Sequence, residues 1–213
     1  MLKLKRLAAM CCAAMLTLGA SALAETQVNV TALKGPTAMG MVKLMDEAES
    51  GAVEGNAYSF AIAAAVDEVT PKIVKGETDI AAVPANLASV LYQNTKGEVQ
   101  VLAVNTLGVI YIVESGDSVK SVEDLRGRTI YASGKGATPE YALNYILSEN
   151  GIDSAKDVTI EWKTADEVQA LMASGEAKIA MLPVPAATAV LMKNQDVRAA
   201  IDLNDAWRDV GAG

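Results

Sequence analysis

The residues of this sequence best placed to do chemistry lie in one short run, Ser133-Gly134-Lys135-Gly136, which follows an apolar segment. A serine near a lysine can act as a nucleophile and its base, and glycines around a lysine occur in phosphate-binding loops. The serine and lysine stand only two residues apart in a glycine turn, which favours an ordinary loop over a catalytic dyad. The run also lacks the earlier glycine of a P-loop, and Gly136 stands where that motif has Ser or Thr. We therefore interpret this run as a loop whose backbone amides and lysine side chain can hold an anion.

The composition removes most of the side chains that enzymes use. Histidine is absent from the chain, and its two cysteines, Cys11 and Cys12, both lie near the amino terminus. Histidine and cysteine supply most zinc sites and most pairs of a nucleophile with its base. We therefore expect no catalytic residue, no metal site and no cofactor. An enzyme that relies on carboxylates, lysine or serine is the alternative that stays open.

The amino terminus has the features of a secretory signal peptide. Lys3, Lys5 and Arg6 precede an apolar run, residues 7–22, that ends in the small-residue tripeptide Ala22-Leu23-Ala24. This run is shorter than the roughly 20 residues that a membrane-spanning helix needs. We predict cleavage after Ala24 and export to the periplasm or the extracellular space. The remaining 189 residues contain no cysteine.

The charge of the exported chain bears on its partners. Loss of the signal peptide leaves 15 basic and 26 acidic residues, a net charge of −11. An acidic chain is repelled by phosphate backbones and by anionic lipid, so we expect no nucleic-acid partner. Apolar residues make up 51% of the sequence, which is enough to build the core of one or two domains.

Two blocks of the sequence repeat at nearly equal spacings. The pattern Asp-Glu-Val, Gly-Glu, Ile-Ala, Pro over residues 67–84 recurs over residues 166–183, displaced by 99. Upstream of each block, Lys-Gly-Pro-Thr at 34–37 recurs as Lys-Gly-Ala-Thr at 135–138, displaced by 101. Because the two displacements agree, we infer a duplicated unit of about one hundred residues.

Each unit shows strands that alternate with helices. Short apolar runs rich in β-branched residues predict the strands, and continuous apolar runs are typical of parallel strands covered on both faces. The predicted strands are 27–33, 58–63, 80–83, 128–132, 158–162 and 179–182. This alternation predicts the α/β class, with two similar lobes, mainly parallel sheets and a ligand cleft between the lobes. We expect lobe I to span residues 25–106 and lobe II to span residues 107–213.

Capping residues predict where several helices begin. Thr138 suits an N-cap with Pro139 at the first helical position, for a helix that runs to Glu149. Thr164 and Glu167 form the pattern of a capping box. Another helix is expected to start at Thr70-Pro71, and glycines just past the helix ends are Gly76, Gly151 and Gly175. The spacing of Met39, Met41 and Met45 predicts a helical stripe that faces the sheet.

The repeated loops are the candidate binding site. Ligands of parallel sheets bind at the carboxyl ends of the strands, and helix N-termini there favour an anionic group. Turn formation and helix capping are the alternative roles of these loops, notably for Asn86, and Tyr58, Tyr131 and Trp162 suit either the core or stacking on a planar ligand. The predicted ligand-binding residues are Lys34, Gly35, Pro36, Thr37, Pro84, Ala85, Asn86, Ser133, Gly134, Lys135, Gly136, Ala137, Thr138, Pro183 and Val184.

A family resemblance lies in Ser121-Val122-Glu123-Asp124-Leu125-Arg126-Gly127-Arg128-Thr129-Ile130, in the glycine-rich turn after it and in residues 76–84. These segments resemble the type II periplasmic binding proteins of ABC importers, and most closely the branch that binds alkanesulfonates, taurine and thiamine precursors. The resemblance implies two lobes that close over a solute about a hinge at residues 101–106. It also implies a chain that is incomplete at its carboxyl end, because proteins of this family continue further.

The sequence thus predicts the solute-binding component of an importer, which captures a small, anionic organic solute. We expect a monomer that delivers its solute to an ABC permease and its ATPase. A receptor domain of the same fold that senses the solute, without transport, is the alternative. The less favoured interpretation is an enzyme that uses neither a metal ion nor histidine.

Overall fold

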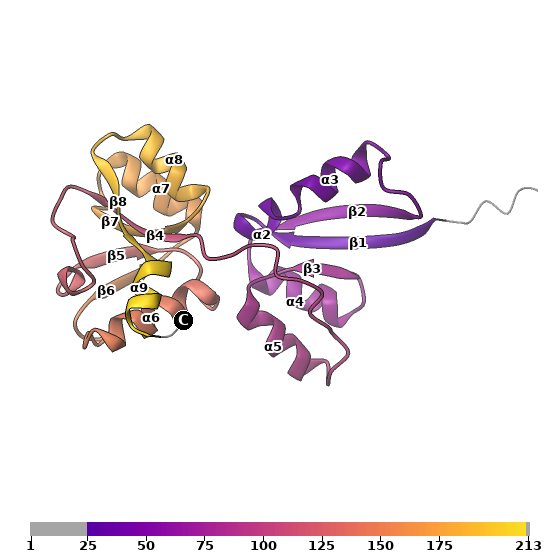
Figure 1. The fold of residues 1–213 in the computed structure, drawn as a ribbon, viewed down its shortest axis with the longest axis horizontal. Helices are drawn as coiled ribbons and strands as arrows, with labels where there is room; N and C mark the ends of the chain where they lie inside the picture. Colours follow the sequence, from indigo (N-terminus) through magenta and orange to yellow (C-terminus); the bar gives the residue numbers. More distant parts are fainter. Residues whose placement is uncertain (1–24, 212–213) are drawn as a thin grey trace, which may run out of the picture.

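The computed structural model describes residues 25–211, so the predicted signal peptide and both cysteines lie outside the described residues. Two α/β lobes lie beside each other, and residues 95–109 lead from the first to the second (Figure 1). The name lobe I is used here for the elements from β1 to α5, and lobe II for the elements from β4 to α9. No helix in the described part of the chain is long and apolar enough to cross a bilayer.

Lobe I is built on a small parallel sheet. Its strand order is β2-β1-β3, and β1 is parallel to both of its neighbours. The helices α3 and α4 lie on opposite sides of this sheet (Figure 1). In chain order the elements are β1 (Thr26–Leu33), α2 (Pro36–Met39), α3 (Val42–Glu49), β2 (Asn56–Ala63), α4 (Val66–Val74), β3 (Ile80–Ala82) and α5 (Ala85–Asn94).

Lobe II repeats this arrangement and extends it. Its order is β6-β5-β7-β4-β8, in which β5 is parallel to β6 and β7, while β4 is antiparallel to β7 and β8. The elements are β4 (Ile110–Ser115), a 3-10 turn (Glu123–Leu125), β5 (Thr129–Ala132), α6 (Thr138–Glu149), β6 (Thr159–Trp162), α7 (Ala165–Ser174), β7 (Ile179–Pro183), α8 (Ala186–Lys193), β8 (Val197–Asp202) and α9 (Leu203–Asp209). The predicted fold class, two similar α/β lobes with mainly parallel sheets, is confirmed.

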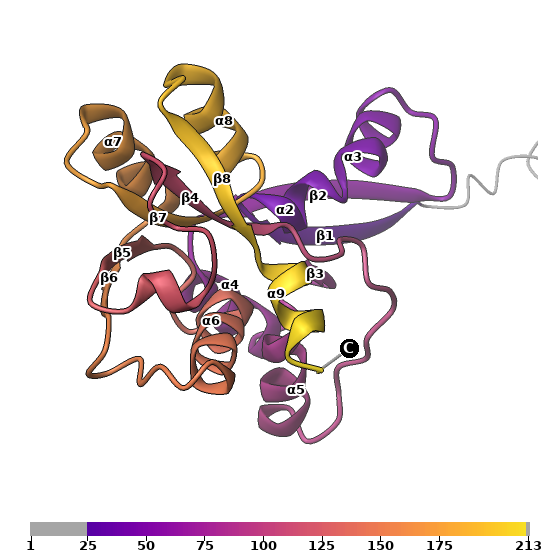
Figure 2. The same cartoon turned by 60° about the vertical axis from the view of Figure 1, so that its left-hand side comes forward.

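The apolar strand β7 shows why lobe II has a core on each face of its sheet. Successive side chains of a strand point to opposite faces. Ile179 and Met181 pack in one core with residues of α6, and Ala180 and Leu182 pack in the other with residues of α7 and α8. All four are buried, as expected for a parallel strand covered on both sides. Figure 2 shows β8 running into α9, which packs on α6.

Lobe I has a much smaller core. Its buried cluster contains only Leu33, Ala63 and Val69, packed with a few half-buried neighbours. The strand β3 pairs with β1 alone, whereas β4 covers the corresponding edge of β7 in lobe II. Within residues 25–211 no strand pairs with the second edge of β3. The next segment of chain carries exposed apolar side chains, among them Val101, Leu102 and Val104.

Two predicted helix starts are wrong. The helix α4 begins at Val66, four residues before the predicted Thr70-Pro71, and Pro71 lies inside it. The earlier turn forms because Val69 is fully buried against β1 and β2, which offsets the one hydrogen bond that Pro71 cannot donate. Thr138 is not an N-cap: Ala137 occupies that position and Thr138 is the first helical residue. The capping box of Thr164 and Glu167 is confirmed.

The predicted methionine stripe is also wrong. Gly40 and Met41 separate α2 from α3, so Met39 and Met45 do not belong to one helix. Met39 is about half exposed, and α3 buries none of its residues completely. Position 40 also has no room for a side chain, because a Cβ at Gly40 would lie 2.8 Å from side-chain atoms of Asn105 and Thr106.

Candidate functional site

A cleft of about 2020 Å³ lies between the two lobes. Loops at the carboxyl ends of strands from both sheets line it, which is where parallel sheets place their ligands. The space continues along the open edge of β3 to residues 98–109, so it exceeds the roughly 300–1,000 Å³ of a typical ligand pocket. The part between the loops is the candidate site.

Most of the predicted binding residues meet in this cleft. Asn86 and Gly136 do not line it, and contact each other instead. Val184 lines a separate, smaller pocket beside Pro36 and Thr106. The predicted residues that line the cleft are Lys34, Gly35, Pro36, Thr37, Pro84, Ala85, Ser133, Gly134, Lys135, Ala137, Thr138 and Pro183.

Two further loops line the cleft that the sequence analysis did not include. One consists of residues 64–65, between β2 and α4, with Val66 at the start of α4, and the other of residues 163–164, between β6 and α7, with Asp166 in the first turn of α7. Both follow the carboxyl end of a parallel strand, so the rule that selected the other loops would also have selected these. They add Lys163, an exposed cation, and Asp166, an exposed carboxylate.

Polar contacts join the two lobes across the cleft. Lys34 of lobe I forms an ion pair with Asp166 of lobe II, with Nζ 2.6 Å from Oδ2. The Asn86 side chain donates from Nδ2 to the backbone oxygen of Gly136 at 3.3 Å. The Thr138 hydroxyl donates to Asn86 Oδ1 at 3.0 Å. The lobes are therefore in contact through the loops that were predicted to hold a ligand.

Carboxylates of the protein already occupy two of the helix N-termini at the cleft. At α6, the Gly136 amide donates to the Glu140 carboxylate at 2.6 Å, so the protein's own acid occupies that anion site. At α7, Glu167 accepts bonds from the Thr164 hydroxyl and amide, and these bonds hold the pKa of Glu167 below its usual range. An incoming anion must therefore rely on the loop lysines and on other amides.

Three lysines supply the positive charge of the cleft. Lys135 and Lys163 are exposed on lobe II, and neither forms an ion pair within the part of the chain that the structure describes. Lys34 is held by Asp166. Among the same described residues no hydrogen bond joins Ser133 to Lys135, and Ser133 is only 5% exposed. The amide of Ser133 donates to the Met181 backbone, which fits a turn residue.

The loop at residues 34–37 is tied to the crossing between the lobes. The Asn105 side chain donates to the Thr37 backbone oxygen at 3.0 Å, and the Thr106 hydroxyl donates to that of Pro36 at 3.0 Å. On the other side, the Asn204 side chain donates to the Gly108 backbone oxygen at 3.0 Å. The crossing thus contacts both a candidate binding loop and the start of α9.

Known structures share this fold. An ABC transporter protein from Parabacteroides distasonis aligns with a TM-score of 0.66 and 22% identity, over 84% of this chain and 60% of that one. The periplasmic aliphatic sulphonate binding protein SsuA from Escherichia coli gives 0.62 and 18%, over 89% and 69%. A binding protein component of an ABC phosphonate transporter from Pseudomonas aeruginosa gives 0.59 and 12%, over 87% and 73%. The chain thus spans 60% of the length of the first of these structures.

Sequence comparison adds the family. No curated protein sequence matches the chain. The family model for periplasmic substrate-binding proteins of phosphonate ABC transporters matches residues 48–204, most of the 213 residues. That match includes the predicted loop residues 84–86, 133–138 and 183–184, and both sides of the cleft. The chain therefore belongs to the family of periplasmic substrate-binding proteins of phosphonate ABC transporters.

Proposed function

We propose that this protein is the extracytoplasmic solute-binding component of an ABC importer and that it captures a small, anionic organic solute. Its lobes are residues 25–106 and 107–213, and its signal peptide is removed after Ala24. One observation carries the proposal: glycine-rich loops from both lobes meet on a single cleft that also contains lysines. The phosphonate family model and the sulphonate-binding structure support an oxyanion as the solute group.

Capture is a population shift between open and closed forms. A solute that touches loops of both lobes binds the closed form better than the open form, and so it traps the closed form. Residues 34–37 of lobe I and residues 133–138 of lobe II are the main contacts. Lys135 and Lys163 place two ammonium groups at the cleft. An ammonium group attracts a phosphonate or sulfonate as a point charge and forms charge-assisted hydrogen bonds with its oxygens.

The crossing segment is the hinge of this motion. Asn105 and Thr106 bond the backbone of the loop at residues 34–37, so movement of that loop is linked to the hinge. No bond of the solute is made or broken, and the protein acts as a carrier rather than an enzyme. The family supports delivery of the solute, from the periplasm, to an ABC permease that a cytoplasmic ATPase drives. We propose that the carrier is a monomer.

A thermal-shift screen tests this function. The exported chain is mixed with alkylphosphonates, alkylsulfonates, carboxylates and uncharged analogues of the same size. We expect a rise in melting temperature with at least one phosphonate or sulfonate, since a ligand that binds only the folded state stabilises it. Lys135→Gln reduces that rise, while Lys75→Gln, outside the cleft, leaves it unchanged. No rise with any anion would contradict the proposal.

A further inference from the structure

One ion pair joins the two lobes within residues 25–211, that of Lys34 with Asp166. The partners are 132 positions apart in the sequence, and both line the cleft. Their side chains are 61% and 68% exposed, so water and solutes reach both groups. The pair is thus an accessible contact inside the candidate site.

The internal repeat allows the ion pair of Lys34 and Asp166 to be compared with the equivalent residues of the other repeat unit. Lys34 corresponds to Lys135, and Asp166 corresponds to Asp67, at the spacings of the duplicated blocks. A symmetric molecule would also pair Lys135 with Asp67, yet neither residue is in an ion pair within the described residues. Two equivalent lysines therefore face the cleft in different states, one held by a carboxylate and the other free.

We propose that Asp166 determines specificity by holding Lys34 until an anionic solute displaces it. This inference rests on the proposed function. The solute oxyanion takes the place of the Asp166 carboxylate beside the Lys34 ammonium, so the ion pair and the bound solute exclude each other. A neutral solute of the same shape cannot take the place of the carboxylate beside the ammonium group, so only an anionic solute releases Lys34 from Asp166.

The exposure of the pair sets the size of the effect. Exposed ion pairs contribute about 0.2–1 kcal/mol, so Asp166 lowers affinity for the anion by about 1.5-fold to fivefold. The pair also holds the lobes together when no solute is bound, beside the bonds that Asn86 makes to Gly136 and Thr138. When a solute displaces Asp166 from Lys34, contacts between the solute and both lobes replace the ion pair that held the lobes together.

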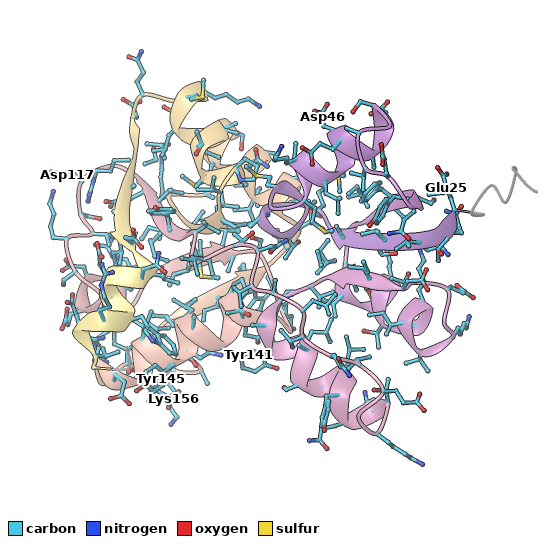
Figure 3. All side chains as sticks on the ribbon, turned by 45° about the vertical axis from the view of Figure 1, so that its right-hand side comes forward. Glu25, Asp46, Asp117, Tyr141, Tyr145 and Lys156 are labelled. Carbon is cyan, nitrogen blue, oxygen red and sulfur yellow. The ribbon has the colours of Figure 1, made fainter. Side chains whose placement is uncertain are left out.

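Calorimetric titration with ethylphosphonate tests the displacement. We expect Asp166→Asn to bind about 1.5-fold to fivefold more tightly than wild type, since the competing carboxylate is gone. Lys34→Gln binds more weakly. In the double variant, Asp166→Asn adds nothing to Lys34→Gln, because Asp166 acts through Lys34. The control is Asp153→Asn, which removes the exposed ion pair of Asp153 with Lys156. Lys156 lies on the outer surface of lobe II (Figure 3), and we expect this variant to leave the affinity for ethylphosphonate unchanged.

Weaker or unchanged binding by Asp166→Asn overturns the proposal, as does tighter binding that persists without Lys34. A solute-free measurement separates this failure from failure of the proposed function. Because residues 25–213 contain no cysteine, Glu49→Cys and Glu149→Cys carry a spin label on each lobe. We expect Asp166→Asn, but not Asp153→Asn, to shift the distance distribution between the labels. If wild type binds no ethylphosphonate, a shift still supports the inter-lobe pair, and an unchanged distribution rejects it.

Discussion

Asn86 at the start of α5 and Thr138 at the start of α6 meet across the cleft, where the Thr138 hydroxyl donates to Asn86 Oδ1 at 3.0 Å. Asn86 also donates to the Gly136 backbone oxygen. Both residues were predicted to contact a solute, and in the structure they contact each other. The candidate site is thus closed in part by the residues predicted to bind.

Removal of this contact is expected to open the lobes. Asn86→Ala loses two hydrogen bonds that join the lobes, and each contributes about 0.5–1.5 kcal/mol. We expect a larger radius of gyration in solution scattering and little change in the cooperative unfolding of lobe II. Ser89→Ala is the control, because its hydroxyl bonds to the Asn86 backbone inside lobe I. An unchanged radius for Asn86→Ala would show that this contact does not hold the lobes.

Two glycines of the loop between β5 and α6 give a matched pair. Gly134 and Gly136 both have positive φ, 92° and 74°. A Cβ at Gly134 would lie 2.7 Å from Pro139 Cγ, whereas one at Gly136 would meet nothing within 4 Å. Gly136→Ala therefore costs about 1–2 kcal/mol from backbone strain alone. In Gly134→Ala the clash adds about 1–3 kcal/mol, which urea unfolding can resolve. Equal losses would contradict the packing described for Pro139.

The buried carboxylate of Glu114 makes lobe II sensitive to acid. Burial raises the pKa of Glu114, but bonds from the hydroxyl and amide of Ser118, the amide of Val119 and the guanidinium of Arg198 outweigh it. The pKa in the folded protein is therefore below its ordinary value of 4.5. The ionised form is the one that the fold stabilises.

The direction of the pH effect follows from that lowered pKa. The stabilisation by Glu114 is complete above pH 4.5 and is lost as pH falls from there through the lower folded pKa. We expect Glu114→Gln to lose about 1–3 kcal/mol at neutral pH and to flatten the acid side of the stability profile. The exposed Glu149→Gln serves as the control and changes neither. A Glu114→Gln profile parallel to wild type would contradict this account.

The core of lobe II and the crossing segment should differ in their response to loss of a leucine. Leu182 of β7 is fully buried, whereas Leu102 of the crossing segment is 76% exposed. Leu182→Ala is expected to lower the free energy of unfolding by about 2–5 kcal/mol, as in other cores. Leu102→Ala is expected to change it by less than about 0.5 kcal/mol. Chemical denaturation of both variants decides the point, and a large loss for Leu102→Ala would place that residue in a core.

Local patterns in the sequence predicted the fold well. The capping box of Thr164 and Glu167 involves residues three apart, and it formed as expected. The apolar run of β7 likewise predicted a strand buried on both faces. Such features depend on neighbours along the chain, so the sequence alone is sufficient for them.

Features that depend on distant residues were not predicted. Thr138 has the side chain of an N-cap, but its hydroxyl bonds to Asn86 in the other lobe. The close packing at Gly40 involves Asn105, which lies 65 positions later in the chain. The pairing of Lys34 with Asp166 requires both lobes to be placed first. Each of these contacts is set by tertiary structure, which no short pattern records.

The most direct test of the central claim is a nuclear magnetic resonance titration of the isotope-labelled exported chain with ethylphosphonate. The account predicts that backbone amides of Gly35 in lobe I and of Gly134 in lobe II shift together and saturate at the same concentration, because one solute touches both loops. Amides of the outer surface, such as those near Asp46 and Asp117 (Figure 3), should stay in place. Shifts confined to one lobe, or none in either loop, would contradict capture of a solute between the lobes.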